Sequence, residues 1–235
     1  MSVRKIQFAN GEFYHIYNRG TDKRNIFSDE ADQWRFIQSM QEFNALDPIG
    51  SIYEHCRTKN SPHAQFGSKA SKSEKVNESL VNIVAYCLNP NHYHFLLQQV
   101  SEKGIEKFMQ RLGTGYTKYF NNKEERSGGL FEGKFQAIHI DSNEYLLHVS
   151  VYVNLNDRVH GFGSKASKFS ASKFSEAVPI KSKSSWDEYM GKANDPFCET
   201  SNVLGQFKSR KDYEVFAENT LVGIRERKIL AREKF

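Results

Sequence analysis

The chain contains two kinds of apolar pattern, one typical of β-strands and one typical of α-helices. Short stretches rich in apolar, aromatic and β-branched residues predict strands at residues 13–18, 81–88, 92–99 and 130–140. Apolar residues at helical spacing predict helices at residues 28–46, 103–122 and 143–158. This mixture indicates an α+β fold in which helices pack on an antiparallel sheet. Trp34, Ile37, Met40 and Phe43 of the first helix are expected in the core.

Two polar stretches interrupt this pattern. Residues 58–79 are rich in Ser, Lys and Asn and show no periodicity, and the sequence FGSKASK occurs both at 66–72 and at 162–168. These units are too short and too polar to form a core of stacked repeats, so we interpret them as flexible, low-complexity insertions. Nonspecific contact of their lysines with a nucleic-acid backbone is the less favoured interpretation.

The chain is therefore expected to contain one main domain and a C-terminal part. Residues 1–160 form the main domain, with the first insertion near 58–79. The second insertion covers 161–184, and residues 185–235 form a C-terminal helical extension.

Composition restricts the function only weakly. The 235 residues carry a net charge of +5 and a pI of about 8.9, which suits an anionic partner but also an ordinary soluble protein. The three cysteines are far apart and form no CxxC pattern, which indicates reduced thiols. With no apolar signal segment and no run long enough to span a bilayer, we expect a cytoplasmic protein that does not enter membranes.

The most informative stretch is the predicted strand that begins just after the turn Asn89-Pro90-Asn91. His92 and His94 stand two positions apart, and side chains two apart in a strand project from the same face. Two adjacent imidazoles form half of a metal site. The rest of the chain must then provide a further ligand and a reactive group.

The helix predicted at 143–158 provides candidates for both. His148, Tyr152 and Asn156 follow one another at i, i+4 and i+8, within about one quarter-turn, with apolar residues on both flanks. The narrow exposed edge is expected at Ser150, Asn154 and Asp157. The stripe should therefore face the sheet, where its polar groups need partners. For this helix taken alone, a buried tyrosine bonded to a buried asparagine is the favoured explanation, and only the histidine pair shifts the balance toward a site. His148 is either a core histidine or a group close to the site.

Several sequence blocks, in the same order, resemble the HUH single-tyrosine transposases, and in particular the REP-associated tyrosine transposases. The blocks lie at residues 13–20, 85–97, 116–121, 129–137, 152–156 and 185–191. The chain departs from the family pattern at Asp157, where relatives have proline, and at Lys134, where arginine is common.

The resemblance implies a ferredoxin-like sheet and a function for the main domain as an HUH catalytic domain. In that function Tyr152 attacks single-stranded DNA, with or without hairpin repeats, and forms a covalent 5′-phosphotyrosine that later allows rejoining. Imidazole and carboxamide ligands suit Mg²⁺ or Mn²⁺, so His92, His94 and Asn156 are the expected metal ligands. Candidate DNA-backbone contacts are Arg19, Lys107, Arg111, Lys118 and Lys134.

Other functions and arrangements remain open from the sequence. A replication or relaxase-type HUH nickase would use the same residues, and a domesticated nucleic-acid-binding protein would have lost catalysis. A histidine-triad phosphohydrolase is disfavoured because Leu96 stands where a third alternating histidine would be needed. Tyr116 and Tyr119 are rival nucleophiles. Both a monomer and a homodimer fit, as does action of Tyr152 in either subunit.

Overall fold

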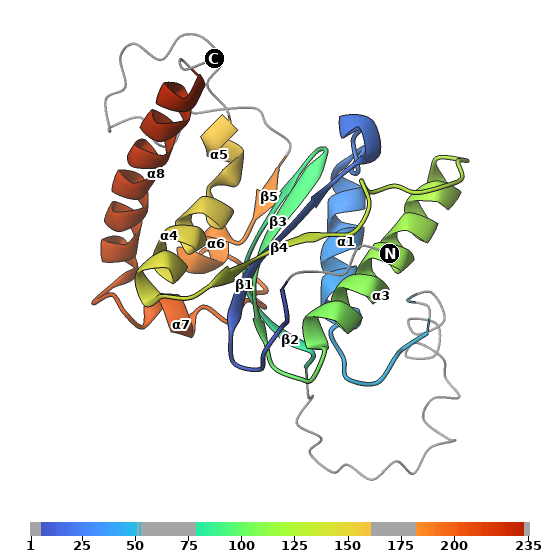
Figure 1. The fold of residues 1–235 in the computed structure, drawn as a ribbon, viewed down its shortest axis with the longest axis horizontal. Coiled ribbons are helices and arrows are strands. Elements are labelled where there is room, and N and C mark those ends of the chain that lie inside the picture. The colour runs from blue at the N-terminus through green and yellow to red at the C-terminus, as the bar shows by residue number, and fades with distance from the viewer. Residues whose placement is uncertain (1–5, 51, 53–78, 161–181, 233–235) are drawn as a thin grey trace.

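A central antiparallel sheet organises the part of the chain that the computed structural model describes, residues 6–50, 52, 79–160 and 182–232 (Figure 1). Its strands lie in the order β4-β1-β3-β2-β5. Their bounds are Phe13–Arg19 for β1, Val81–Asn89 for β2, His92–Gln99 for β3, Gln136–Ile140 for β4 and Lys183–Ser184 for β5. Nearly all of both predicted insertions lies outside the described residues.

The connections between the strands give the fold its class. Helix α1 (Glu30–Glu42) lies between β1 and β2, and α3 (Gly104–Lys123) lies between β3 and β4. This β-α-β-β-α-β order, with the four long strands arranged β4-β1-β3-β2, is the ferredoxin-like arrangement. The predicted α+β class is therefore confirmed. A short 3₁₀ helix, η1 (Thr21–Lys23), follows β1.

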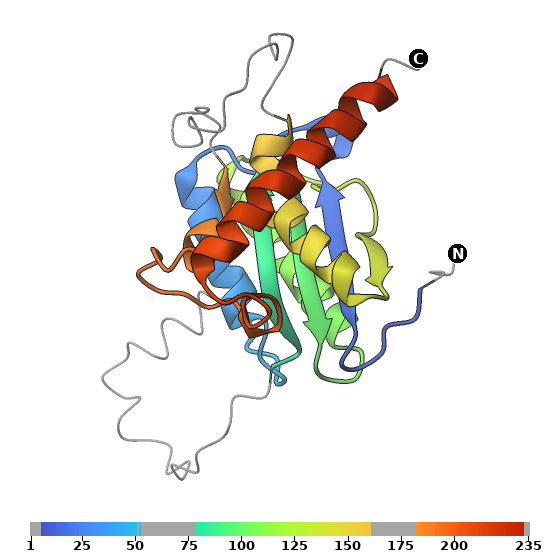
Figure 2. The same cartoon turned by 90° about the vertical axis from the view of Figure 1, so that its left-hand side faces the viewer.

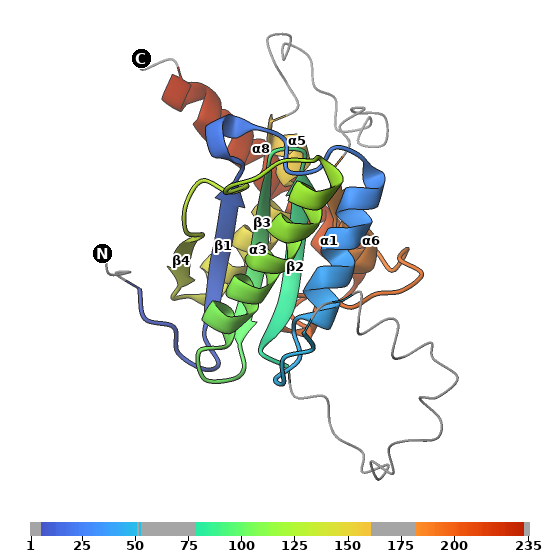
Figure 3. The ribbon, with the colours of Figure 1, turned by 90° about the vertical axis from the view of Figure 1, so that its right-hand side faces the viewer.

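Helices cover both faces of the sheet. Figure 3 shows α1 and α3 on one face, and Figure 2 shows α4 and α8 on the other. The second face is covered by elements that follow residue 142. These are α4 (Asn143–Asn154), α5 (Asn156–His160), α6 (Trp186–Tyr189), α7 (Ser201–Leu204) and α8 (Arg210–Arg232). No helix among the described residues is both long enough and apolar enough to cross a membrane.

Alternation along β3 divides its side chains between two cores. Tyr93, Phe95 and Leu97 pack with α1 and α3, whereas Leu96 packs with residues of α4 and α8. Because His92 and His94 have the same parity as Leu96, they project toward the α4 side. The expected common face of the two histidines is thus present.

Two predicted elements have different limits in the structure. The helix expected at 143–158 is interrupted at Leu155, whose backbone (φ −113°, ψ 22°) departs from helical geometry, so α4 and α5 are separate. The strand expected at 130–140 begins only at Gln136. Gly133 in the preceding segment has φ +71°, a left-handed conformation that a strand does not allow.

The C-terminal extension also differs from expectation. Residues 202–207 and 213–216 each predict a short helix, and residues 222–235 predict a helix that frays. A short helix is present at 201–204 (α7), but residues 210–232 form one helix of 23 residues, α8. Its buried Tyr213, Ala217 and Leu221 recur every fourth residue and pack against the α4 core. This regular apolar stripe stabilises the helix between Tyr213 and Leu221.

The polar edge predicted for the helix at 143–158 is not exposed. Ser150 and Asn154 are fully buried, and both hydrogen-bond the Tyr213 hydroxyl of α8, at 3.1 and 3.2 Å. Asp157 is half-buried. The prediction was wrong because α8 covers this edge and supplies the polar partners that solvent would otherwise provide.

One predicted core residue lies on the surface. The Trp34 ring is 56% exposed, and the Lys183 ammonium lies 4.1 Å from its centroid. The other three predicted residues of α1 and its end, Ile37, Met40 and Phe43, are buried as expected.

Two of the three glycines of α3, Gly104 and Gly113, provide a test of this packing. A Cβ at Gly104 would lie 2.0 Å from the Leu80 carbonyl oxygen, whereas a Cβ at Gly113 meets nothing within 4 Å. We expect Gly104→Ala to destabilise the protein by about 1–3 kcal/mol through overpacking. We expect Gly113→Ala to stabilise it by about 0.5–1 kcal/mol, because helix-interior glycine is unfavourable. Chemical denaturation of both variants checks this, and equal effects would contradict the packing described.

Candidate functional site

The histidine pair lies at the start of β3, on the sheet face that α4 covers. The ring centroids of His92 and His94 are 5.2 Å apart and the rings are perpendicular. His94 is buried and His92 is half-buried. The turn between β2 and β3 places Asn89 beside the pair, with its amide nitrogen 3.1 Å from His92 Nε2.

Asn156 reaches the pair from the first position of α5. Its Oδ1 lies 3.3 Å from His92 Nε2 and accepts a hydrogen bond of 3.0 Å from Asn89 Nδ2. The Asn156 side chain is fully buried. Although the helix is interrupted at Leu155, Asn156 still faces the histidines.

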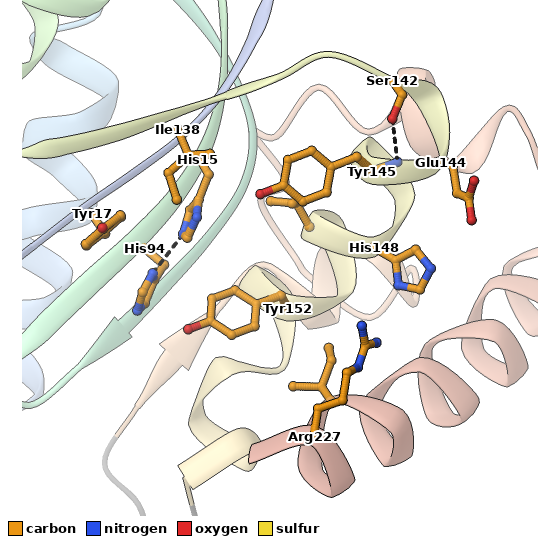
Figure 4. Close-up of a pocket in the computed structure, with 12 residues that line it drawn as sticks. His15, Tyr17, His94, Ile138, Ser142, Glu144, Tyr145, His148, Tyr152 and Arg227 are labelled. Atoms are coloured by element: carbon orange, nitrogen blue, oxygen red, sulfur yellow. Dashed lines mark hydrogen bonds between the residues drawn. The ribbon is translucent and has the colours of Figure 1, made fainter. Parts of the chain in front are cut away.

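Tyr152 lies one turn before Asn156, near the end of α4, with its ring edge-on to His94. The two ring centroids are 5.4 Å apart, and Figure 4 shows the Tyr152 ring projecting from α4 toward His94. Burial raises the pKa of the Tyr152 phenol above its usual value, and the Asn156 side chain acts in the opposite direction. In the protein alone the phenol is therefore protonated at neutral pH.

His15 of β1 belongs to the site, although the sequence analysis assigned no role to it within the block at residues 13–20. Its Nε2 lies 2.9 Å from His94 Nδ1, and burial lowers the pKa of His15 to about 4, so this ring is neutral at pH 7. When His94 Nδ1 donates its proton to His15, the lone pair of His94 Nε2 is left for another partner. Antiparallel pairing of β1 with β3 brings them together, since Tyr17 lies opposite His94.

The donor chemistry of this cluster fits a divalent cation. In the described residues no group of three or more His, Cys, Asp or Glu side chains is arranged to hold a metal. The candidate set instead joins the imidazoles of His92 and His94 to the carboxamide of Asn156. Ligand atoms at 2.0–2.1 Å from an octahedral ion are about 3 Å apart. The 3.3 Å between His92 Nε2 and Asn156 Oδ1 is close to that spacing.

His148 does not share in this cluster. Its ring lies 5.9 Å from the Phe216 ring of α8, and Figure 4 shows it toward Arg227, away from His94. The predicted stripe is therefore divided, with Tyr152 and Asn156 at the histidines and His148 at the helix interface.

The rival tyrosines lie on the opposite face of the sheet. The Tyr116 hydroxyl donates to the Ile26 carbonyl at 2.6 Å, and the Tyr119 hydroxyl donates to Asp32 at 3.0 Å. Both are engaged in the α1–α3 layer. Tyr17, which the sequence did not single out, stacks on His94 with ring centroids 5.7 Å apart.

Of the five candidate DNA-contacting cations, Arg19 lies nearest to the histidine pair. It is exposed and forms a two-bond ion pair with Glu132. Together with Lys23 and Asn91 it lines a cavity of about 550 Å³ that also includes both histidines. Its position suits a charged ligand that enters the site from solvent.

The other four cations lie away from the histidines. Lys107 and Arg111 belong to α3 on the opposite face, and Arg111 donates to the backbone carbonyls of Ala45 and Leu46. Lys118 and Lys134 line a separate cavity of about 720 Å³ beside α3.

Part of the chain, including most residues of this site, is similar to a known protein family. Residues 53–156 match the family model described as "Transposase IS200 like", a stretch that includes His92, His94, Tyr152 and Asn156. The resemblance to tyrosine transposases is thus confirmed, and the match supports a function of the transposase kind. No curated protein matches the chain.

The solved structures that are similar to the chain include one of low sequence identity. It is described as a REP-associated tyrosine transposase bound to a REP hairpin. It has 13% sequence identity and a TM-score of 0.47, over 84% of this chain and 90% of that one.

The ligand assignment predicts where metal affinity is lost. We expect His92→Ala and His94→Ala each to weaken Mn²⁺ binding more than tenfold, measured by isothermal titration calorimetry, because each removes a ligand. The control is His139→Ala, since His139 is an exposed histidine of β4 paired with Glu12. Equal affinity in all four proteins would contradict the assignment.

His15 is expected to act on the same equilibrium through His94. Loss of a hydrogen-bonding partner of a ligand histidine costs about 10–100-fold in metal affinity. We expect that loss in His15→Ala and a smaller loss in His15→Gln, whose carboxamide can still accept the proton of His94. Identical affinities of these two variants would show that the hydrogen bond does not position His94.

Proposed function

We propose that the protein is a metal-dependent single-stranded DNA transposase that cleaves and rejoins DNA through a covalent 5′-phosphotyrosine on Tyr152. The observation that carries this proposal is the convergence of His92, His94, Asn156 and Tyr152 on one face of the sheet. The match of the same stretch to the IS200-like transposases supports it.

The covalent step is a transesterification. The Tyr152 oxygen forms a bond to phosphorus, and the bond between phosphorus and the 3′-oxygen breaks. In the overall balance the phenol proton is transferred to that 3′-oxygen, so the products are a 5′-phosphotyrosine and a free 3′-hydroxyl. Rejoining is the reverse step with the same or another 3′-hydroxyl. Because one phosphodiester replaces another, no nucleotide cofactor is needed.

The surrounding residues position these groups. A divalent cation, Mg²⁺ or Mn²⁺, would polarise the phosphodiester and favour the phenolate when bound by His92, His94 and Asn156. His15 holds the ring of His94, and Asn89 holds the carboxamide oxygen of Asn156. Tyr152 lies against His94 of its own chain, which supports action of the tyrosine within its own subunit.

Single-stranded DNA, with or without a hairpin repeat, is the proposed partner. The cavity at the histidine pair is lined by two cations, Arg19 and Lys23, and by one carboxylate, that of Glu132. Its lining therefore carries a net positive charge. Positive charge at this position favours the strand backbone.

The proposal predicts that Tyr152→Phe abolishes a covalent protein–DNA product. The protein is incubated with Mg²⁺ or Mn²⁺ and single-stranded oligonucleotides from its own genomic flanks, and the products are separated on a denaturing gel. Because the variant lacks only a hydroxyl, we expect its DNA binding to remain within a factor of about three, measured by fluorescence anisotropy.

Matched tyrosine variants identify the nucleophile. Tyr17→Phe and Tyr119→Phe should still form the adduct, because neither hydroxyl is the proposed attacking group. An adduct that persists in Tyr152→Phe and disappears in Tyr17→Phe would move the nucleophile to β1. If the unaltered protein binds DNA but cleaves no strand with either ion, the domesticated binding protein is the correct interpretation.

A further inference from the structure

A second cavity, of about 820 Å³, opens directly beside Tyr152, and the mechanism above assigns no part of the substrate to it. It lies between the sheet, α4 and α8 (Figure 4). Aromatic rings of Tyr17, Tyr145 and Tyr152 line it, and Ile138, Val149 and Ile224 provide apolar surface. Its volume is within the range of about 300–1,000 Å³ typical of small-ligand sites.

The charges around this cavity differ from those of the Arg19 cavity. Its lining contains one carboxylate, Glu144, and one guanidinium, Arg227, which balance. The Arg19 cavity has two cations and one carboxylate. An anionic backbone is therefore favoured in the Arg19 cavity, and a neutral, flat group in the cavity beside Tyr152.

The two cavities meet at the reactive centre. Tyr17 and His94 line both of them, so a ligand that crosses the histidine pair can occupy both at once. A DNA strand has the required composition, with charged phosphates on one side and neutral, flat bases on the other. Aromatic side chains that line a strand-binding groove stack on such bases without regard to sequence.

We infer that the cavity beside Tyr152 binds the base of the nucleotide that becomes attached to Tyr152, with Tyr145 as the stacking residue. This inference rests on the proposed function for the identity of that nucleotide. Attacking and leaving oxygens lie roughly in line in phosphoryl transfer, so the departing 3′-oxygen points away from Tyr152. The nucleotide on the 3′ side of the break keeps the phosphate that Tyr152 attacks. Its base therefore stays close to Tyr152.

Tyr145 suits this role by its place in the fold. It lies in the first turn of α4, which Ser142 caps by accepting a hydrogen bond from the Tyr145 backbone N–H. Its side chain is 36% exposed, and Figure 4 shows the ring projecting from α4 toward His15, on the same side as Tyr152. A base that enters the cavity can thus meet the Tyr145 ring without displacement of the core.

A binding experiment tests the cavity without any cleavage. The probe is 2-aminopurine deoxyriboside 5′-monophosphate, a base with its own 5′-phosphate, whose fluorescence falls when the base stacks. We expect the protein to quench it, Tyr145→Ala to weaken binding about tenfold, and Tyr145→Phe to retain it. Trp34→Ala is the matched control, because Trp34 is an exposed aromatic residue on the other face of the sheet.

A cleavage experiment identifies the nucleotide. An oligonucleotide that the protein cuts is remade with an abasic site either just 3′ or just 5′ of the break. We expect adduct formation to slow about tenfold with the 3′ abasic site only. Tyr145→Ala should slow adduct formation with the intact strand by a similar factor. With the 3′ abasic strand, the variant and the unaltered protein should form the adduct at the same rate.

The outcomes separate this inference from the proposed function. Absence of quenching, or quenching that Tyr145→Ala leaves unchanged, overturns the base site even when cleavage proceeds. A stronger effect of the 5′ abasic site overturns the assignment of the nucleotide. Quenching that depends on Tyr145 in a protein that forms no adduct supports the base site and contradicts the catalytic function.

Discussion

The antiparallel pairing of β1 with β3 is the constraint on which the site depends. It places Tyr17 opposite His94 and Arg19 opposite His92, so that groups from two distant parts of the chain share one sheet face. Side chains along a strand alternate between the two sheet faces. A shift of β3 by one residue relative to β1 would therefore turn both histidines into the α1–α3 core. The neighbouring residues Tyr93 and Phe95 hold this register by their burial on the other side of the sheet.

A buried polar network fixes α4, and with it Tyr152, against the sheet. The Tyr213 hydroxyl of α8 bonds Ser150 and Asn154, and Ser185 donates to the Asn154 carboxamide oxygen at 2.6 Å. Fully paired polar groups of this kind define one position for a helix, since any slip leaves a buried group without a partner. The position of the proposed nucleophile is thus maintained by residues far from it in the sequence.

Much of the fold could be predicted from local patterns, and the missed features depend on long-range contacts. The strands and the common face of His92 and His94 follow from the period of two. The break at Leu155 could not be foreseen, because Leu155 is apolar and neither glycine nor proline marks the position. No role could be assigned to His15, since its partner His94 is defined only by strand pairing. Burial of Ser150 depends on Tyr213, 63 residues later.

The packing of α8 on α4 means that residues 1–160 are not an independent structural module. Residues 1–160 contain the proposed reactive groups, whereas the partners of the buried Ser150 and Asn154 side chains lie at Ser185 and Tyr213. The segment that contains the proposed reactive residues is therefore shorter than the segment needed to support their positions. Recombination that transferred only the first 160 residues to another protein would deliver the reactive residues without the support that orients them. The C-terminal helix and the sheet face with the proposed reactive residues thus form one folding unit, despite the low-complexity sequence between them.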